Sequence, residues 1–286
     1  MQFNCWKSSS SKKKISFISE KLPISKIQFI QKKGFNYEEI KKNDLNLDEK
    51  KKLKLIKNKK KSILFADDYK FTKKWYKTIK KKINELIIIN DFDKKLKKII
   101  HINPSIIKSD IKNKVYGLPI VNKKFNIKNY TERFKSIKKN KIILVSFGAS
   151  DNENCTKKII DLINCKLFYN YKIYIIIGEF YKFEKNLYDS IKNKKNIKIY
   201  KNITNLKKLF LKTKFAITSA GVISRELINF GIPSIIFKIS KNQNKNFQFY
   251  KKYKIFDIFE NKNFSRINKK KFNNLLLKKI NNFNLK

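Results

Sequence analysis

The stretch IILVSFGASD, residues 142–151, carries the strongest indication of the fold in this chain. An apolar run over residues 142–147 predicts a strand, which ends at Gly148 in a turn of small residues followed by helical spacing. A tight turn of this kind exposes backbone N–H groups and a helix N-terminus to an anion. Gly148, Ala149 and Ser150 are therefore candidate phosphate-binding residues, with an ordinary strand-to-helix turn as the alternative.

The rest of the second half alternates between apolar strand patterns and amphipathic helix patterns. Strands are expected at residues 142–147, 172–177, 197–200, 215–218 and 234–237. Helices are expected at residues 154–163, 183–191 and 222–230, and a further one that carries Leu206 and Phe210 behind a Thr204 cap. Regular alternation with short connections predicts a parallel sheet covered by helices.

The first half repeats this rhythm less regularly. Strands are expected at residues 15–18, 63–66 and 86–89, and helices near residues 25–33, 48–58 and 72–82. The segment 41–61 fits a charged linker and a solvated helix equally well. Because the pattern turns polar and basic near residues 130–140, we predict two domains, 1–138 and 139–286. The expected fold class is α/β, with two Rossmann-like domains of parallel sheets in the arrangement called GT-B.

The charge balance is extreme, with 70 Lys+Arg against 22 Asp+Glu and a net charge of +48. Only Arg133, Arg225 and Arg266 are arginines, and the lysines are spread along the whole chain. Nucleic-acid binders favour Arg and gather their positive charge on one face. We therefore attribute the excess of lysine mainly to an A/T-rich coding sequence. A basic protein that binds nucleic acid or an anionic surface remains an alternative. The same coding bias makes glycine, alanine, arginine and proline scarce, so the two places where they gather, residues 148–149 and 220–233, are informative.

Several classes of protein are disfavoured by what the sequence lacks. No apolar run reaches the ~18–20 residues that span a bilayer, and the N-terminus has no signal-peptide pattern. The three cysteines have no metal-binding spacing. His101, the only histidine, lies in an apolar run and is expected to be structural. We therefore predict a cytoplasmic protein with no membrane span, no metal and no cofactor.

A second group of small residues lies at TSAGVISREL, residues 218–227. Ser219, Ala220 and Gly221 would let a ligand approach the backbone at a helix start, and Glu226 can accept hydrogen bonds from a ribose diol. The alternative for Glu226 is a solvated carboxylate paired with Arg225 or a lysine.

Two shorter polar groups also follow predicted strands. Asn242 and Gln243 can hydrogen-bond a sugar or a uracil edge, although surface amides are plentiful in this chain. In the first half, Asp67 and Tyr69 can position a water or a sugar hydroxyl, or else cap a turn and pack.

Together these segments resemble the UDP-2,4-diacetamido-2,4,6-trideoxy-β-L-altropyranose hydrolases of pseudaminic acid biosynthesis. Residues 145–151 are similar to the S-F-G-G-S-D motif of that family, with Ala149 for its second glycine. Residues 67–69 are similar to its D-H-Y element, with Asp68 for the histidine. The segments 219–226, 231–233 and 242–243 match its nucleotide-sugar half, and peptidoglycan N-acetylglucosaminyltransferases share these last motifs.

The resemblance implies an inverting hydrolysis of a UDP-linked diacetamido-trideoxy sugar to free sugar and UDP. It implies that Gly148, Ser150 and the turn 219–221 hold the phosphates, that Glu226 binds ribose, and that Asn242 and Gln243 bind the sugar or nucleotide. Tyr69 and Asp67 would act at the reacting centre, and no metal is required. We expect a monomer that does not bind nucleic acid. The alternatives are a GT-B glycosyltransferase with the same donor, a polyanion-binding protein and an inactive remnant.

One family element has no counterpart in the sequence as written. The family begins with a strand and a G-x-G-H-x-x-R loop whose histidine is the expected catalytic base. Only residues 1–14 precede the matching second strand. The resemblance therefore leads us to expect an incomplete first domain and poor hydrolysis.

Overall fold

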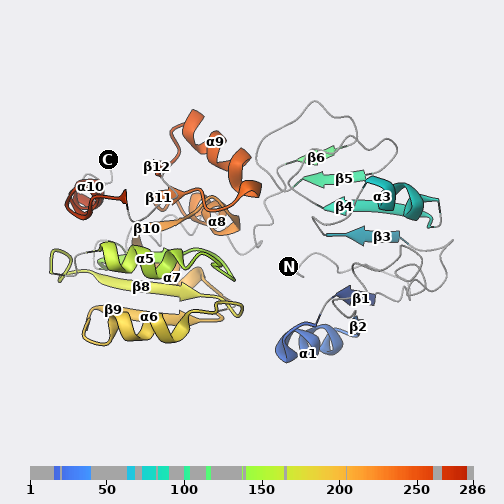
Figure 1. Ribbon diagram of the computed structural model, residues 1–286, viewed down its shortest axis with the longest axis horizontal. Coiled ribbons are helices and arrows are strands. Elements are labelled where there is room, and N and C mark those ends of the chain that lie inside the picture. The colour runs from blue at the N-terminus through green and yellow to red at the C-terminus, as the bar shows by residue number, and fades with distance from the viewer. Residues whose placement is uncertain are drawn as a thin grey trace. The chain divides into compact units, whose positions relative to one another are not determined.

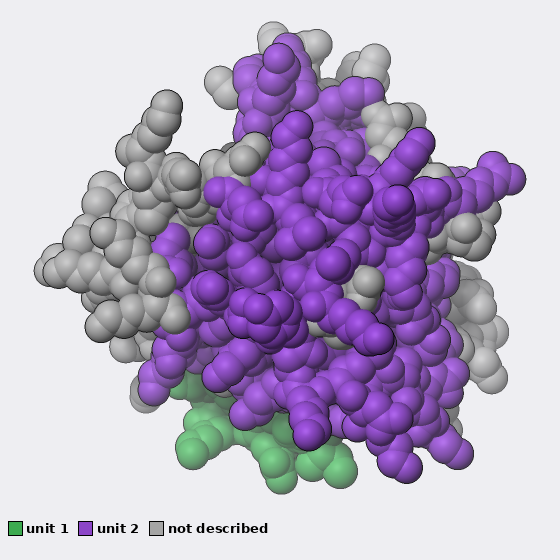
Figure 2. Space-filling model, turned by 90° about the vertical axis from the view of Figure 1, so that its left-hand side faces the viewer, with its two compact units in different colours: residues 1–104, 109–115 green, residues 105–108, 116–286 purple. Residues whose placement is uncertain are grey.

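The computed structural model describes residues 16–19, 21–39, 63–67, 73–81, 83–89, 100–103, 114–116, 137, 140–163, 166–203, 205–259 and 266–281. The chain divides into two compact units (Figure 2). One consists of residues 1–104 and 109–115, and the other of residues 105–108 and 116–286. The predicted boundary between residues 138 and 139 falls outside the described ranges and stays a prediction.

A six-stranded sheet forms the centre of the second unit (Figure 1). All its neighbouring strands are parallel, and their order is β12-β11-β10-β7-β8-β9. The strands are β7 (Ile142–Ser146), β8 (Lys172–Ile177), β9 (Ile197–Lys201), β10 (Thr213–Ser219), β11 (Ser234–Phe237) and β12 (Asp257–Phe259). The chain builds outwards from β7 to β9 and then returns to the other side of β7. This is the doubly wound Rossmann order, with its switch point between β7 and β10.

Helices cover both faces of this sheet. On one face lie α5 (Cys155–Leu162), α6 (Glu184–Ile191) and α10 (Lys269–Asn281). On the other lie α7 (Lys207–Lys212), α8 (Val222–Asn229) and α9 (Asn244–Lys252), and the short 3-10 helix η3 (Lys241–Gln243) leads into α9. In β7, Ile143 and Val145 pack on the first layer and Leu144 on the second. Because both faces are covered, all five residues of β7 are buried.

The first unit contains a four-stranded sheet in the order β3-β4-β5-β6. Its elements are β3 (Ile63–Ala66), α3 (Lys73–Lys80), β4 (Glu85–Ile89), β5 (Ile100–Asn103) and β6 (Lys114–Tyr116). Trp75 and Ile79 of α3 pack against Leu86 and Ile88 of β4. A separate parallel pair, β1 (Ser16–Ser19) and β2 (Asn36–Glu39), is connected by α1 (Ile24–Lys32).

The predicted α/β class with parallel sheets is confirmed, and the predicted strands of the second unit match within about two residues at each end. The N-cap of α7 is Leu206, and Thr204, the predicted cap, lies outside the described residues. The helix expected at residues 48–58 lies outside the described residues. Within the described ranges, no helix combines the length and the apolar character needed to cross a membrane.

Candidate functional site

The candidate site lies where β7 and β10 end, at the switch point of the six-stranded sheet. In doubly wound sheets the two loops at this point run in opposite directions, which leaves room for a ligand at the carboxyl ends of the strands. Thr218 Oγ1 donates a hydrogen bond of 2.5 Å to the backbone oxygen of Ser146, and this bond joins the two strand ends. The predicted groups at Gly148–Ser150 and Ser219–Gly221 therefore start from adjacent strands.

The first loop, between β7 and α5, is fixed by an aspartate. Both carboxylate oxygens of the buried Asp151 accept backbone hydrogen bonds of 2.8 Å, one from Cys155 and one from Thr156. The first turn of α5 is thereby capped by the protein's own negative charge. The expectation that this helix N-terminus binds an anion is therefore not supported. The exposed turn before it contains Gly148, whose φ of +97° favours glycine.

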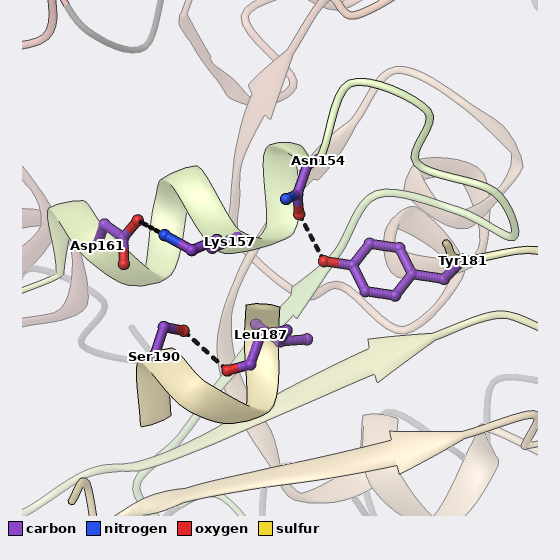
Figure 3. A network of polar contacts seen from close by, with 6 residues as sticks. All are labelled: Asn154, Lys157, Asp161, Tyr181, Leu187 and Ser190. Atoms are coloured by element: carbon purple, nitrogen blue, oxygen red, sulfur yellow. Dashed lines mark hydrogen bonds and ion pairs between the residues drawn. The ribbon is translucent and has the colours of Figure 1, made fainter. Parts of the chain in front are cut away.

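The next loop along the sheet, between β8 and α6, packs directly against the first. A Cβ added to Gly178 would lie 2.4 Å from Ala149 Cα, so only glycine permits this approach. The backbone N–H of Phe180 donates to the backbone oxygen of Ala149 at 3.3 Å. Tyr181 Oη donates to Asn154 Oδ1 at 2.5 Å, a bond that reaches the start of α5 (Figure 3). These contacts hold the β7–α5 and β8–α6 loops together.

The loop between β10 and α8 is held from the other side of the switch point. Gln243 Nε2 donates to Ser219 Oγ at 3.3 Å, while Gln243 Oε1 accepts from the backbone N–H of Ile239 at 3.2 Å. Asn246 Nδ2 of α9 donates to the backbone oxygen of Ala220 at 3.1 Å. Gln243, predicted as a ligand-binding residue, thus also braces the loop that would contact the ligand.

A buried hydroxyl pair strengthens the start of α8. Ser224 Oγ donates to the backbone oxygen of Gly221 at 2.6 Å and lies 2.9 Å from Tyr250 Oη. Burial raises the pKa of Tyr250, although hydrogen bonding to Ser224 and the charge of Arg225 act in the opposite direction. Tyr250 therefore stays protonated and supports the start of α8 through Ser224. Asn246 likewise has a structural role, through its bond to Ala220. Neither residue is predicted from the sequence, because neither belongs to a recognisable motif.

The N-termini of α5 and α8 differ in their electrostatics. The N-cap of α8 is Gly221, which has no side chain to cap the helix, and the first turn of α8 contains no acidic residue. In α5 the partial positive charge of the first turn is met by Asp151, which precedes the helix, whereas the N-cap position of α8 is a glycine. At this edge of the sheet, α8 is the better place for an anion.

The remaining predicted residues of the second unit lie on α8 and η3. Glu226 is buried one turn into α8. Asn242 is half-buried in η3, and its Oδ1 accepts a hydrogen bond from Ser240 Oγ. The nine predicted substrate-binding residues thus lie between the carboxyl ends of β7, β10 and β11 and the first two turns of the helices that follow these strands.

The predicted catalytic residues belong to the first unit. Asp67 is exposed directly after β3, at the carboxyl end of that strand as expected. Tyr69 lies outside the described residues. The backbone of His101 is part of β5 and is paired with Ile88 of β4, and its structural role stays a prediction.

Cys155, the first residue of α5, is not suited to nucleophilic chemistry. Its side chain is fully buried, and burial together with the Asp151 charge raises the pKa of its thiol to about 12. The thiolate, which is the reactive form, is therefore scarce at neutral pH. Among the described residues, no cluster of three or more His, Cys, Asp or Glu side chains could hold a metal ion.

Comparisons with known proteins place this arrangement in a known fold. No protein-family model matches the sequence. An uncharacterized protein of Methanocaldococcus jannaschii is 28% identical over 244 residues, which are 79% of this chain and 49% of that protein. The chain thus spans about half the length of this curated relative.

Two solved structures cover both units. MurG of Acinetobacter baumannii has a TM-score of 0.55 at 13% identity, over 93% of this chain and 82% of the other. A glycosyltransferase from Rickettsia africae has a TM-score of 0.51 at 12% identity, over 94% and 83%. At these identities the likeness concerns the fold alone. The chain has an α/β, GT-B-like fold.

Proposed function

We propose that this chain binds a UDP-sugar at the carboxyl edge of the six-stranded sheet and transfers the sugar from UDP to water. The observation that carries the proposal is the start of α8 at the switch point. There the backbone approach at Ser219–Gly221 meets a helix N-terminus whose N-cap is a glycine and whose first turn has no acidic residue. A diphosphate has the charge and the oxygen acceptors that such a place binds. The opposite loop, at Gly148–Ser150, supplies the second wall.

The residues around this place suit the other parts of a nucleotide sugar. Glu226 provides a carboxylate one turn into α8, the right chemistry for a ribose diol. Asn242 and Gln243 provide amides after β11, which suit sugar hydroxyls and acetamido groups. The resemblance to hydrolases of a UDP-linked diacetamido-trideoxy sugar agrees with this distribution of groups.

The proposed reaction is a displacement at the anomeric carbon. Water attacks that carbon, the bond from carbon to the UDP oxygen breaks, the water loses a proton, and UDP leaves with the bonding electrons. The reaction needs a base for the water and positive charge for the departing diphosphate. In the second unit, α8 supplies part of that charge. From the resemblance, we propose Asp67 and Tyr69 as the residues that act on the water.

A glycosyltransferase is the second candidate, and one observation favours it. The two solved structures described above are MurG and a glycosyltransferase, and the fold is common to all three chains. In this case a sugar hydroxyl would replace water as the nucleophile. Incubation with a UDP-sugar, with and without candidate acceptors, followed by chromatography of UDP and sugar products, distinguishes the two reactions.

Gly221 offers the sharpest test of the binding site. An added Cβ would meet Gln243 Nε2 and Ser219 Oγ only at 3.5 Å, and the φ of −92° allows any residue, so Gly221→Ala should fold. The methyl would, however, occupy the space where the diphosphate approaches the backbone. Overpacking of about 1–3 kcal/mol corresponds to a roughly 5–150-fold loss of affinity for UDP, measurable by calorimetry.

Tyr169→Ala provides the control for this test. Tyr169 is exposed in the turn before β8, at the opposite edge of the sheet. We expect this variant to bind UDP like the wild type. Unchanged UDP affinity in a folded Gly221→Ala protein would contradict the proposed site.

A further inference from the structure

Phe180, in the loop between β8 and α6, presents an aromatic side chain beside the candidate site. Its side chain is 49% exposed, although it is a large apolar residue, and its backbone is bonded to Ala149 of the β7–α5 loop. It therefore adjoins the wall formed by Gly148–Ser150. Neither the motifs nor the resemblance assigns Phe180 a role.

The loop around Phe180 is held in place from both sides. Before it, Gly178 lies against the backbone of Ala149. After it, Tyr181 is buried and bonded to Asn154 (Figure 3). Burial of Tyr181 also raises its pKa, so that its phenol remains the donor in this bond at neutral pH. An aromatic residue that is exposed between two anchored neighbours is preorganised for a contact and loses little entropy when a ligand binds.

We propose that the ring of Phe180 stacks on the uracil base of the bound nucleotide sugar. This inference rests on the proposed function. The amides of Asn242 and Gln243 and the carboxylate of Glu226 lie after β10 and β11, on one side of the switch point. Phe180 follows β8, on the other side of β7. A diphosphate bound between β7 and β10 leaves the flat base of the ligand free to reach the β8 side, where an aromatic face offers stacking.

Two substitutions test the stacking contact. Phe180→Ala removes the ring, and Phe180→Leu keeps an apolar side chain without an aromatic face. By calorimetry, we expect the affinity for UDP to fall roughly 5–150-fold in Phe180→Ala, and to stay reduced in Phe180→Leu. The affinity for inorganic pyrophosphate, which has no base, should not change. Tyr188→Ala is the matched control, because Tyr188 is equally exposed, at 48%, but lies on α6.

The outcomes separate this inference from the function on which it rests. If the wild type does not bind UDP, the proposed function fails and the stacking contact fails with it. If the wild type binds UDP and Phe180→Ala binds it equally well, only the stacking contact is wrong. A parallel loss of pyrophosphate affinity would also contradict stacking, because it would place Phe180 at the phosphates. Full UDP affinity in Phe180→Leu would contradict stacking as well, because it would show that an apolar side chain without an aromatic face is sufficient.

Discussion

Two glycines at the candidate site are needed for different physical reasons, and substitution should reveal the difference. A Cβ at Gly178 would collide with the backbone of Ala149, which has little freedom to move. A Cβ at Gly148 would meet nothing within 4 Å, so that its φ of +97° is the only penalty. We expect Gly178→Ala to lower the free energy of unfolding by about 3 kcal/mol or more. Gly148→Ala should cost only about 1–2 kcal/mol.

Urea unfolding of both variants measures this difference. Gly148→Ala also serves as the control for the general effect of adding a methyl to a loop glycine. Equal losses in the two variants would show that the contact between Gly178 and Ala149 is not rigid.

Cys155 makes the stability of the second unit depend on alkaline pH. Its thiol has a pKa of about 12 in the folded protein because of burial and the nearby Asp151 charge, against about 8.5 in an unfolded chain. Below about pH 8.5 both states are protonated and the contribution is complete. As the pH rises towards 12, the unfolded state loses its proton first, so the contribution is lost progressively.

The measurement is the free energy of unfolding between pH 8.5 and pH 10.5 for the wild type and Cys155→Ala. The wild-type value should fall more steeply, by at most ~1.4 kcal/mol per pH unit. Ionisable groups away from Cys155 are the same in both proteins, so their contributions cancel in the comparison. Parallel curves would mean that the folded thiol titrates normally.

How far the sequence predicts the site depends on the residue in question. The small residues at 148–150 and 219–221 were recognisable because glycine and alanine are rare in this chain. The capping role of Asp151 was not recognisable, because a carboxylate in a turn can either bind a ligand or cap a helix. The backbone of Asp151 has a φ of 37°. In this conformation both of its carboxylate oxygens accept hydrogen bonds from backbone amides of α5, which the sequence does not reveal.

At the scale of elements, the start of α5 depends on one side chain. Asp151→Ala leaves the amides of Cys155 and Thr156 without their acceptor in a buried place. We expect it to cost about 1–3 kcal/mol of stability. Asp151→Asn keeps one acceptor oxygen and tolerates a positive φ, so its loss should be smaller. Thermal unfolding of the two variants tests this order, and a larger loss for Asn than for Ala would refute the capping role.

Elements with a strong apolar pattern were predicted well, and those that depend on tertiary packing were not. β7, β8 and β11 read as apolar runs because helices cover both of their faces. α9 was not predicted, since Phe247 and Tyr250 are its buried aromatics within a lysine- and asparagine-rich stretch. Its packing on β11 and its bond to Ala220 come from the fold and not from local sequence.

At the scale of the whole molecule, the net charge of +48 has two explanations: a polyanion-binding function or coding bias. The salt dependence of ligand binding distinguishes them. If the charge itself is the function, DNA or RNA binding should dominate and depend on the release of many counterions. A protein that contacts 6–10 phosphates loses roughly 10³–10⁵-fold in affinity between 50 and 200 mM salt. A site built on a helix N-terminus, amide side chains and one carboxylate contacts a single diphosphate, so it should lose far less affinity.

We expect the affinity for UDP to fall by less than about tenfold over this range of salt, because few charges take part in each contact. Any non-specific DNA binding by this basic chain, measured on the same protein by fluorescence anisotropy, should weaken by orders of magnitude over the same range of salt. Gly221→Ala is the internal control, since it should reduce UDP binding and leave DNA binding unchanged. Tight DNA binding that persists at 200 mM salt, together with weak UDP binding, would reverse the assignment. The lysine-rich surface would then be the functional part of the molecule, and the carboxyl edge of the six-stranded sheet would not be the binding site.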